Sequence, residues 1–269
     1  MTAIEVDTPL GPGRLVLDEA AVPRAVLALG HGAGGGIEAF DLAALAAALP
    51  PLGISVARFE QPWRTAGRRV AGAAAGLDTA WRAALAVLIG RRPDLPLVVG
   101  GRSAGARVAC RCWAPPAHGV VALAFPLHPP GRPAASRVTE LAGVAGPVLV
   151  VQGSRDPFGS AAELRAALAE SRTGRPRDED VPPGAADDPA ANGAVEIVEI
   201  EGAVHALGPT RKADDPAVRA RAITAPVARF VLSLAGPATA AGGSTPSGSS
   251  GPTGHHSVRP GPGSPPGRS

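Results

Sequence analysis

A serine stands where an apolar strand pattern gives way to a helical one, and this junction restricts the possible folds more than any other feature of the chain. Residues 97–112 read LVVGGRSAGARVACRC, in which Gly101 and Gly105 flank Ser103 with the spacing G-x-S-x-G. A sharp strand-to-helix turn strains its central residue, and glycines are needed where a Cβ would collide with the neighbouring strand and helix. The strand before and the helix after favour a nucleophile elbow over an ordinary turn, so Ser103 is the candidate nucleophile.

The rest of the chain alternates short apolar or β-branched runs with helical stretches rich in Ala and Leu. This alternation is typical of a mostly parallel sheet with helices on both faces. We expect an opening antiparallel pair of strands and, in all, an eight-stranded sheet. The predicted strands are 4–6, 14–17, 25–29, 54–58, 97–100, 120–124, 148–151 and 195–200, and the predicted helices are 41–49, 78–89, 104–113, 161–170 and 217–234.

Two later residues are candidates to activate Ser103. Asp156 follows the strand 148–151, and His205 follows the strand 195–200. A serine hydroxyl is a poor nucleophile at neutral pH, so it needs a base within hydrogen-bond reach and a third group that fixes the tautomer of that base. The order Ser, Asp, His matches the α/β-hydrolase fold, as does the number of strands. We therefore predict that fold with a catalytic triad of Ser103, Asp156 and His205.

Each supporting residue also has an ordinary interpretation. Asp156 could be a turn residue before Pro157 or a helix cap. Ser160 with Glu163 already forms an S-x-x-E capping box for the next helix, which leaves Asp156 without that local duty. His205 could be a satisfied surface histidine, but its position a short loop after the last predicted strand favours the catalytic interpretation.

A glycine-rich run, HGAGGG at 31–36, directly follows the strand 25–29. An oxyanion needs preorganised backbone donors, and a loop in this place supplies them in such folds. The predicted donors are the backbone amides of Ala33 and Ala104, with His31 as a structural brace for the loop. A phosphate-binding loop is the competing interpretation, but the run lacks a G-K-[ST] ending and a G-x-G-x-x-G pattern with an acidic partner.

Three further polar residues are expected at the same edge of the sheet. Arg58 and Glu60 lie at the end of one strand, and His128 lies in the loop after another. They could shape a substrate pocket, although a buried structural pair between Arg58 and Glu60 is at least as compatible with the pattern. The catalytic set therefore excludes them.

Composition argues against a nucleic-acid or membrane partner. The net charge is only +3 despite a pI of about 9.6, Lys212 is the single lysine, and there is no tyrosine for base stacking. No segment reaches the roughly 18 apolar residues of a membrane span. Cys110 and Cys112 lie two residues apart on a predicted helix and cannot readily pair, which favours reduced thiols and a cytoplasmic location. We expect a monomer or small homo-oligomer that acts on a small-molecule acyl substrate.

The expected organisation is one α/β-hydrolase domain with two irregular segments. The domain covers 1–235 and contains a flexible insertion at 171–193, where prolines mix with both signs of charge. The stretch 236–269, rich in Gly, Pro and Ser, is predicted to be a disordered tail because it has almost no large apolar side chains. His255 and His256 are too few ligands for a metal site there, and no metal or cofactor is predicted.

Five motifs together give the chain a family resemblance that covers nearly all of 26–234. They are HGAG at 31–34, ARFEQPW at 57–63, GGRSAG at 100–105, FPLHPPGRP at 125–133 and VQGSRDPFG at 151–159. The chain resembles the dienelactone-hydrolase-like α/β-hydrolases, in the branch that small bacterial hydrolases share with the regulatory subunit of a chromatin acetyltransferase complex. The resemblance implies a serine hydrolase without a cofactor.

The chain departs from that family at three positions. The family usually has a larger residue, often Met, at the position of Ala104, a Gly at that of Ala106 and an acidic residue at that of Val204. The small Ala104 implies a wider pocket beside the nucleophile, and Val204 weakens the match around His205. Because chromatin-associated relatives serve as interaction modules, two hypotheses stand. One is a hydrolase of small esters or thioesters that works through an acyl-enzyme, and the other is a catalytically silent binding module. A minimal cap is expected, because 59–77 and 125–140 are too short for a large lid.

Overall fold

The computed structural model describes residues 1–173, 194–212 and 214–236. The predicted insertion at 171–193 and the predicted tail at 236–269 lie almost entirely outside these residues. Within the described part, residues 171–173 complete the helix α6 (Ala161–Thr173), which therefore continues past its predicted end at 170.

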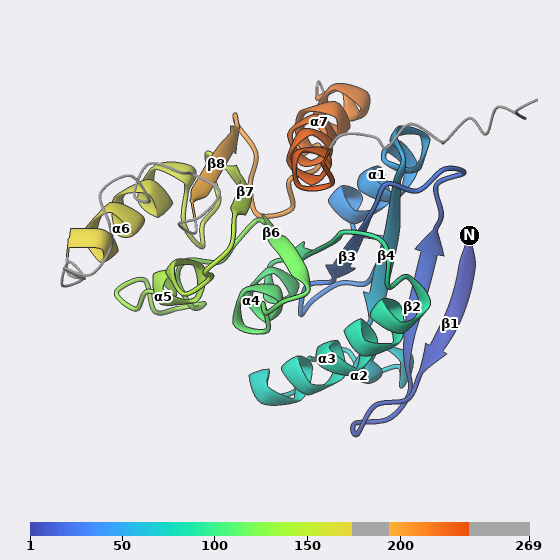
Figure 1. Cartoon of the computed structure of the whole chain (residues 1–269). Coiled ribbons are helices and arrows are strands. Elements are labelled where there is room, and N and C mark those ends of the chain that lie inside the picture. Colours follow the sequence, from blue (N-terminus) through green and yellow to red (C-terminus); the bar gives the residue numbers. More distant parts are fainter. Residues whose placement is uncertain (174–193, 213, 237–269) are drawn as a thin grey trace, which may run out of the picture. The chain divides into compact units, whose positions relative to one another are not determined.

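The predicted eight-stranded sheet is confirmed (Figure 1). β1 pairs antiparallel with β2, and β2 pairs antiparallel with β4, while the pairs from β4 onward in the sheet are parallel. The order across the sheet is β1-β2-β4-β3-β5-β6-β7-β8. The strands are β1 (Thr2–Val6), β2 (Gly13–Asp18), β3 (Ala25–Gly30), β4 (Ile54–Glu60), β5 (Leu97–Arg102), β6 (Ala117–Leu123), β7 (Val148–Gly153) and β8 (Val195–Ile200).

The order of the strands reverses at β3, which lies between β4 and β5. In open parallel sheets, ligands bind in the crevice outside the carboxyl ends of the strands at such a reversal. The glycine-rich run at 31–36 follows β3, and Ser103 follows β5. The topology therefore brings both predicted site segments to this crevice.

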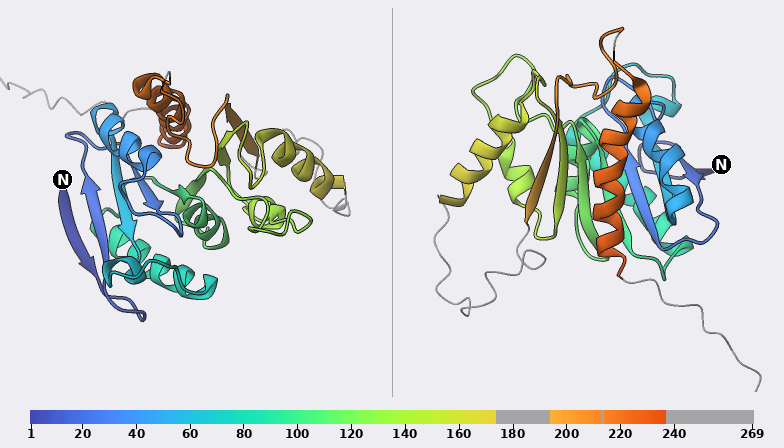
Figure 2. Two further views of the ribbon diagram at one scale, coloured as in Figure 1. Left: turned by 180° about the vertical axis from the view of Figure 1, so that it is seen from behind. Right: turned by 90° about the horizontal axis from the view of Figure 1, so that it is seen from above.

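Helices cover both faces of the sheet, as the two views in Figure 2 show. α1 (Phe40–Ala48) and α7 (Pro216–Leu234) pack against each other on one face. The opposite face carries α3 (Ala74–Arg91), α4 (Ala104–Arg111), α5 (Val138–Ala142) and α6. None of the helices in the described ranges is long and apolar enough to cross a membrane.

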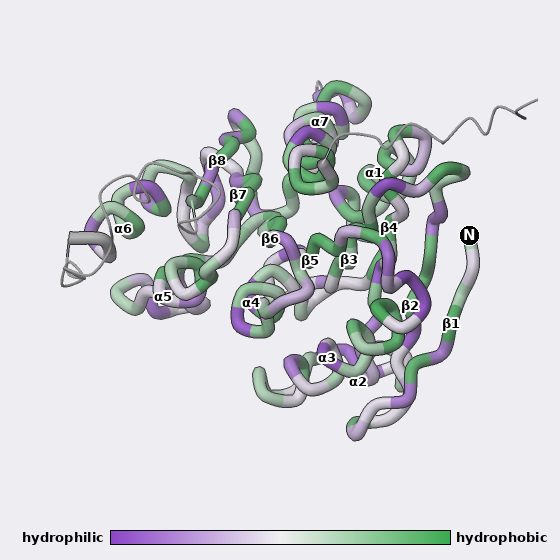
Figure 3. The backbone as a smooth tube through the Cα atoms, viewed as in Figure 1, coloured by the Kyte–Doolittle hydropathy of each residue, from purple (hydrophilic) through white to green (hydrophobic). Residues whose placement is uncertain are grey.

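Alternate residues of the central strands enter different apolar clusters. In β3, Val26 and Ala28 join the cluster beneath α3 and α4, whereas Leu27 and Leu29 join the cluster beneath α1 and α7. Side chains of a strand point alternately to its two faces, and a strand buried on both faces is apolar throughout. The helices that cover the sheet, in contrast, alternate green hydrophobic and purple hydrophilic residues, as α3 and α4 show (Figure 3).

Sequence patterns missed the shortest elements. α2 (Pro62–Thr65, four residues), α5 (five residues) and a 3-10 helix at Pro50–Leu52 are too short for a helical period to be visible. α3 begins at Ala74 rather than at the predicted 78, because its first turn consists of small residues without an apolar stripe. Of the two segments predicted to be too short for a lid, 59–77 contains α2, and 125–140 contains only the start of α5.

Candidate active site

The turn that carries Ser103 has the strained geometry of an elbow. Ser103 has φ 55° and ψ −112°, a conformation that costs an L-residue on the order of 1–3 kcal/mol. A Cβ added at Gly101 would lie 2.6 Å from the Gly30 carbonyl oxygen, and one added at Gly105 would collide with that same carbonyl group. The two glycines are therefore required because the end of β3 packs directly against the turn.

The structure brings the three residues of the predicted triad together. His205 Nε2 lies 2.8 Å from Ser103 Oγ, and His205 Nδ1 lies 2.8 Å from Asp156 Oδ2. The contact with a carboxylate favours a proton on Nδ1, which leaves Nε2 free to accept the hydroxyl proton of Ser103. This geometry would let Ser103 act as a nucleophile, His205 as its base and Asp156 as the acid that orients the base.

Asp156 is fully buried and accepts hydrogen bonds from three sides. The Phe158 amide donates to Oδ1 at 2.9 Å, and Gln152 Nε2 and His205 Nδ1 share Oδ2 at 3.1 and 2.8 Å. Donors of this kind stabilise the charged form of a buried carboxylate. The predicted capping box is confirmed, since Glu163 accepts from the Ser160 amide at 2.7 Å, so Asp156 has no capping role.

The imidazole of His205 is also held from the side. The ring of Phe158 meets it edge-on, with 4.6 Å between the ring centroids and an interplanar angle of 75°. The carbonyl of Ala203, two residues earlier, accepts from the Arg155 amide at 2.9 Å. The Asp156 segment thus contacts both the ring and the main chain of the histidine loop, here defined as residues 201–209.

The glycine-rich loop lies against the elbow. A Cβ added at Gly32 would lie 3.4 Å from the Ser103 Cβ. His31 braces this loop as predicted, because its Nε2 accepts from the Gln61 amide at 3.1 Å and its Nδ1 therefore donates to the Gly32 carbonyl at 2.8 Å. Burial lowers the pKa of His31, which keeps the ring neutral in this arrangement.

Ala33 and Ala104 line one narrow cavity beside Ser103. Neither amide has an acceptor among the described residues, so both are available to an incoming oxygen atom. The cavity has room for about one water molecule in its present form. Its remaining walls are mostly apolar and include Trp63, Leu77, Trp81 and Val108.

A family model identifies the family to which this chain belongs. Residues 23–174, more than half of the chain, match the family model described as alpha/beta hydrolase domain. The chain belongs to the α/β-hydrolases. No curated protein matches its sequence.

Several solved α/β-hydrolase structures share the fold at low sequence identity. An α/β serine hydrolase homologue from Coxiella burnetii has 16% identity and a TM-score of 0.62, over 86% of this chain and 97% of that one. A lid-less α/β serine hydrolase from Xanthomonas campestris has 21% identity and a TM-score of 0.59, over 89% and 96%. The esterase domain of a Rhodothermus marinus protein has 15% identity and a TM-score of 0.58, over 87% and 99%.

This α/β-hydrolase contains a charged pair next to the triad that sequence patterns did not reveal. Arg102 Nε lies 3.1 Å from Asp41 Oδ2, and Arg102 Nη2 donates to the His205 carbonyl at 3.0 Å. Asp41 belongs to the first turn of α1, far from Arg102 in sequence. Gln152, the donor to Asp156, was missed as well. No local motif links these residues, although Arg102 stands inside the elbow motif itself.

The suggested ion pair between Arg58 and Glu60 is wrong, because each of these side chains pairs with a residue of β2 instead. Arg58 contacts Asp18 at 2.9 Å, and Glu60 contacts Arg14 at 2.7 Å, both across the junction of β2 with β4. Alternate residues of a strand point to the same face but lie too far along it for a direct pair to be favoured over neighbours on the next strand. His128 Nδ1 contacts the Ala135 carbonyl at 2.9 Å and thereby braces the loop between β6 and β7.

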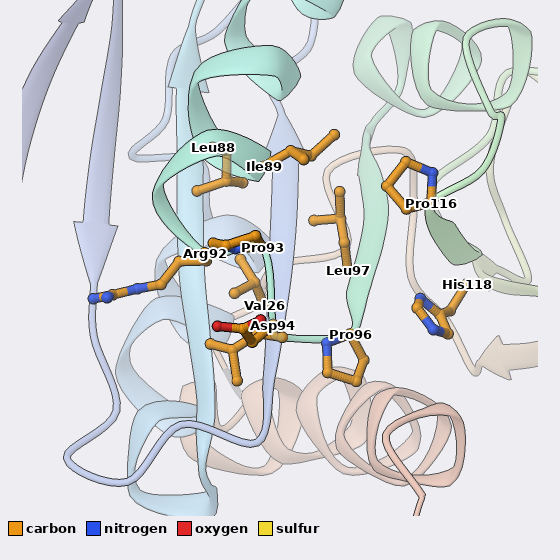
Figure 4. Close-up of a pocket in the computed structure, with 11 residues that line it drawn as sticks. Val26, Leu88, Ile89, Arg92, Pro93, Asp94, Pro96, Leu97, Pro116 and His118 are labelled. Carbon is orange, nitrogen blue, oxygen red and sulfur yellow. The ribbon is translucent and has the colours of Figure 1, made fainter.

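A second hollow lies at the amino ends of the central strands, whereas Ser103 follows the carboxyl end of β5 (Figure 4). It is lined by residues at the amino ends of β3, β5 and β6, including Val26, Leu97 and His118. It shares no lining residue with the cavity beside Ser103. Within the described ranges, no cluster of three or more His, Cys, Asp or Glu side chains is arranged to hold a metal ion.

Proposed function

We propose that this α/β-hydrolase cleaves small esters or thioesters through an acyl-enzyme on Ser103. The observation that carries the proposal is the continuous contact from Ser103 Oγ through His205 to the buried Asp156, with 2.8 Å at each step. A surface histidine or a turn aspartate has no need of this alignment. The strained conformation of Ser103 adds support, because such strain concentrates at functional sites.

The proposed reaction begins when Ser103 Oγ attacks the acyl carbon as His205 Nε2 takes the hydroxyl proton. The π electrons of the substrate carbonyl move to its oxygen atom. The proton transfer converts His205 into an imidazolium, which Asp156 stabilises. When the tetrahedral intermediate collapses, the bond to the leaving group breaks, and His205 returns the proton to the leaving alcohol or thiol. Water then attacks the acyl-enzyme by the same route, which releases the acid and restores Ser103.

The amides of Ala33 and Ala104 are the proposed donors to the oxyanion. Both residues line the narrow cavity at the elbow, and neither amide has an acceptor among the described residues. Preorganised donors of this kind contribute about 3–4 kcal/mol each to transition-state stabilisation. Because the proposed donors are backbone amides, a substitution at either position keeps the donor. It changes only the size of the side chain beside the oxyanion.

The narrow apolar cavity supports small acyl groups as substrates. Trp63 and Trp81 form part of its wall, and Ala104, whose side chain is small, lines it next to the nucleophile in the chain. A long acyl chain would require these side chains to move. We therefore expect kcat/KM to decrease along the series p-nitrophenyl acetate, butyrate and octanoate.

Hydrolysis of p-nitrophenyl acetate by wild type, Ser103→Ala and Ser160→Ala tests the proposal. Ser103→Ala should lose on the order of 10⁶-fold in kcat, as expected when a triad nucleophile is removed. Ser160→Ala removes only a helix cap and should cost about 1 kcal/mol of stability with normal kcat. Equal activity of wild type and Ser103→Ala, both folded, would leave the silent binding module as the function.

A further inference from the structure

Arg102 sends its side chain from the elbow to elements that are distant in sequence. We propose that Arg102 is a positioning residue that aligns the histidine loop with Ser103, an inference that rests on the proposed function and deepens it. Arg102 immediately precedes Ser103 at the end of β5. A shift of its guanidinium would therefore change the position of His205 relative to Ser103.

One end of the contact is Asp41, whose side chain is completely buried in the first turn of α1. Its Oδ1 accepts from the Leu42 amide at 2.9 Å, and its Oδ2 lies 3.1 Å from Arg102 Nε. Neither Arg102 Nε nor Asp41 Oδ2 has an in-line hydrogen bond among the described residues, so the contact is a close ion pair. A buried carboxylate without its cation is strongly unfavourable, so Asp41 fixes the guanidinium in place.

The other end of the contact is the main chain of the triad histidine. Arg102 Nη2 donates to the His205 carbonyl at 3.0 Å. On its third side, Arg102 Nη1 would lie 3.2 Å from a Cβ added at Gly32, in the glycine-rich loop. One planar guanidinium thus joins α1 to the histidine loop and lies near the loop with a proposed oxyanion donor, a geometry that a lysine ammonium cannot reproduce.

Arg102 contacts the histidine loop at the residue that supplies the proposed base. The Asp156 segment holds the histidine loop on one side, through the Arg155 amide and the Ala203 carbonyl. Arg102 holds it on the other side, at the carbonyl of His205 itself. Without this donor the His205 carbonyl loses its side-chain partner, and a displacement of about 1 Å can cost on the order of 100-fold in rate. The loss should fall on kcat, because Arg102 acts through His205 rather than on the substrate.

The ion pair is present at neutral pH. Burial raises the pKa of Asp41 to about 6, against the opposing effect of Arg102 at the end of β5 and of His205 in the histidine loop. Asp41 is therefore ionised above this value and becomes neutral as the pH falls through it. Acidification should therefore loosen the guanidinium by neutralising Asp41.

The test compares kcat and KM for p-nitrophenyl acetate in Arg102→Ala and Arg111→Ala. Arg111 is a matched control on α4, since its side chain is 21% exposed against 15% for Arg102 and it also forms buried ion pairs. Arg102→Ala should lose about 100-fold in kcat with KM nearly unchanged. Arg111→Ala should lose thermal stability while its folded fraction keeps the wild-type kcat.

Chemical rescue separates positioning from a purely structural role. Millimolar methylguanidinium should raise the kcat of Arg102→Ala about tenfold, because it can occupy the vacated place between Asp41 and the His205 carbonyl. Arg102→Lys should retain an intermediate kcat that methylguanidinium does not change. A wild-type kcat in folded Arg102→Ala, or a loss that methylguanidinium does not relieve, would overturn the inference.

The outcomes for wild type separate this inference from the proposed function. If Arg102→Ala does not fold, Arg102→Lys decides, and a folded lysine variant with full kcat contradicts the positioning role. If wild type hydrolyses the ester, only the role of Arg102 is at stake. An inactive wild type that does not react with a serine-directed phosphonate would overturn both proposals.

Discussion

The elbow that carries Ser103 and the histidine loop meet across a 2.8 Å contact, but different kinds of interaction hold them. The elbow is fixed by backbone packing, since Gly101 and Gly105 lie directly against the carbonyl of Gly30. The histidine loop is fixed by side chains and single hydrogen bonds from separate elements, among them Arg102 and Phe158. The position of Ser103 therefore depends on the packing of backbone against backbone, whereas that of His205 depends on side chains from several separate elements.

Removing the base gives the largest expected effect and separates catalysis from loop structure. His205→Ala should lower kcat/KM on p-nitrophenyl acetate by on the order of 10⁵- to 10⁶-fold. The side chain is 20% exposed and the loop keeps its main-chain contacts, so the thermal midpoint should hardly change. Steady-state kinetics with calorimetry checks both, and a variant with normal turnover would remove His205 from the mechanism.

A pair of glycine substitutions compares the backbone packing of the two regions. Gly105→Ala places a Cβ against the Gly30 carbonyl and should cost about 3–5 kcal/mol or abolish folding. Gly202→Ala, at the start of the histidine loop, meets no atom within 4 Å and should cost only about 1 kcal/mol for its φ of +68°. Urea unfolding measures both. Equal losses would mean that the two regions are held in the same way.

The pH dependence of stability tests the buried anchor of the histidine loop. The pKa of Asp41 is about 6 in the folded chain against 3.8 for an ordinary aspartate, so folding favours its protonated form. Its stabilising contribution is complete at low pH and is lost as the pH rises through about 6. Relative to wild type, Asp41→Asn should therefore gain about 3 kcal/mol of unfolding free energy between acidic and neutral pH. Parallel pH profiles for the two proteins would contradict this pKa.

The aromatic support of His205 gives the smallest expected effect. Phe158→Ala removes the edge-on ring contact, which is worth about 1 kcal/mol, and should lower kcat about fivefold. Phe158→Leu keeps apolar bulk beside the imidazole and should lose less. An unchanged kcat in folded Phe158→Ala would show that hydrogen bonds alone orient the ring.

Local patterns in the sequence were sufficient to predict the eight strands and the sharp turn at Ser103. β3 is apolar throughout because helices cover both of its faces, and the flanking glycines of Ser103 mark a close approach that only they permit. Asp156 and His205 could be predicted because each follows a strand within a short loop. The short helices α2 and α5 could not, since four or five residues show no period.

The pairing of distant charges was beyond sequence reasoning. Arg102 contacts Asp41, and Arg58 contacts Asp18 rather than Glu60, because strand register and helix placement decide which side chains meet. Gln152 was equally invisible, although it lies fully buried and donates to Asp156 at 3.1 Å. Such contacts depend on the complete fold.

The most direct test of the account is stoichiometric labelling by a fluorophosphonate, followed by mass spectrometry of the modified peptide. The reagent traps an activated serine without knowledge of the substrate, because its phosphorus atom accepts the serine oxygen and expels fluoride. We predict one adduct per folded wild-type chain, located at Ser103. Ser103→Ala should form no adduct, and His205→Ala should form it much more slowly. Folded wild-type protein that remains unlabelled, or a label at another serine, would contradict it.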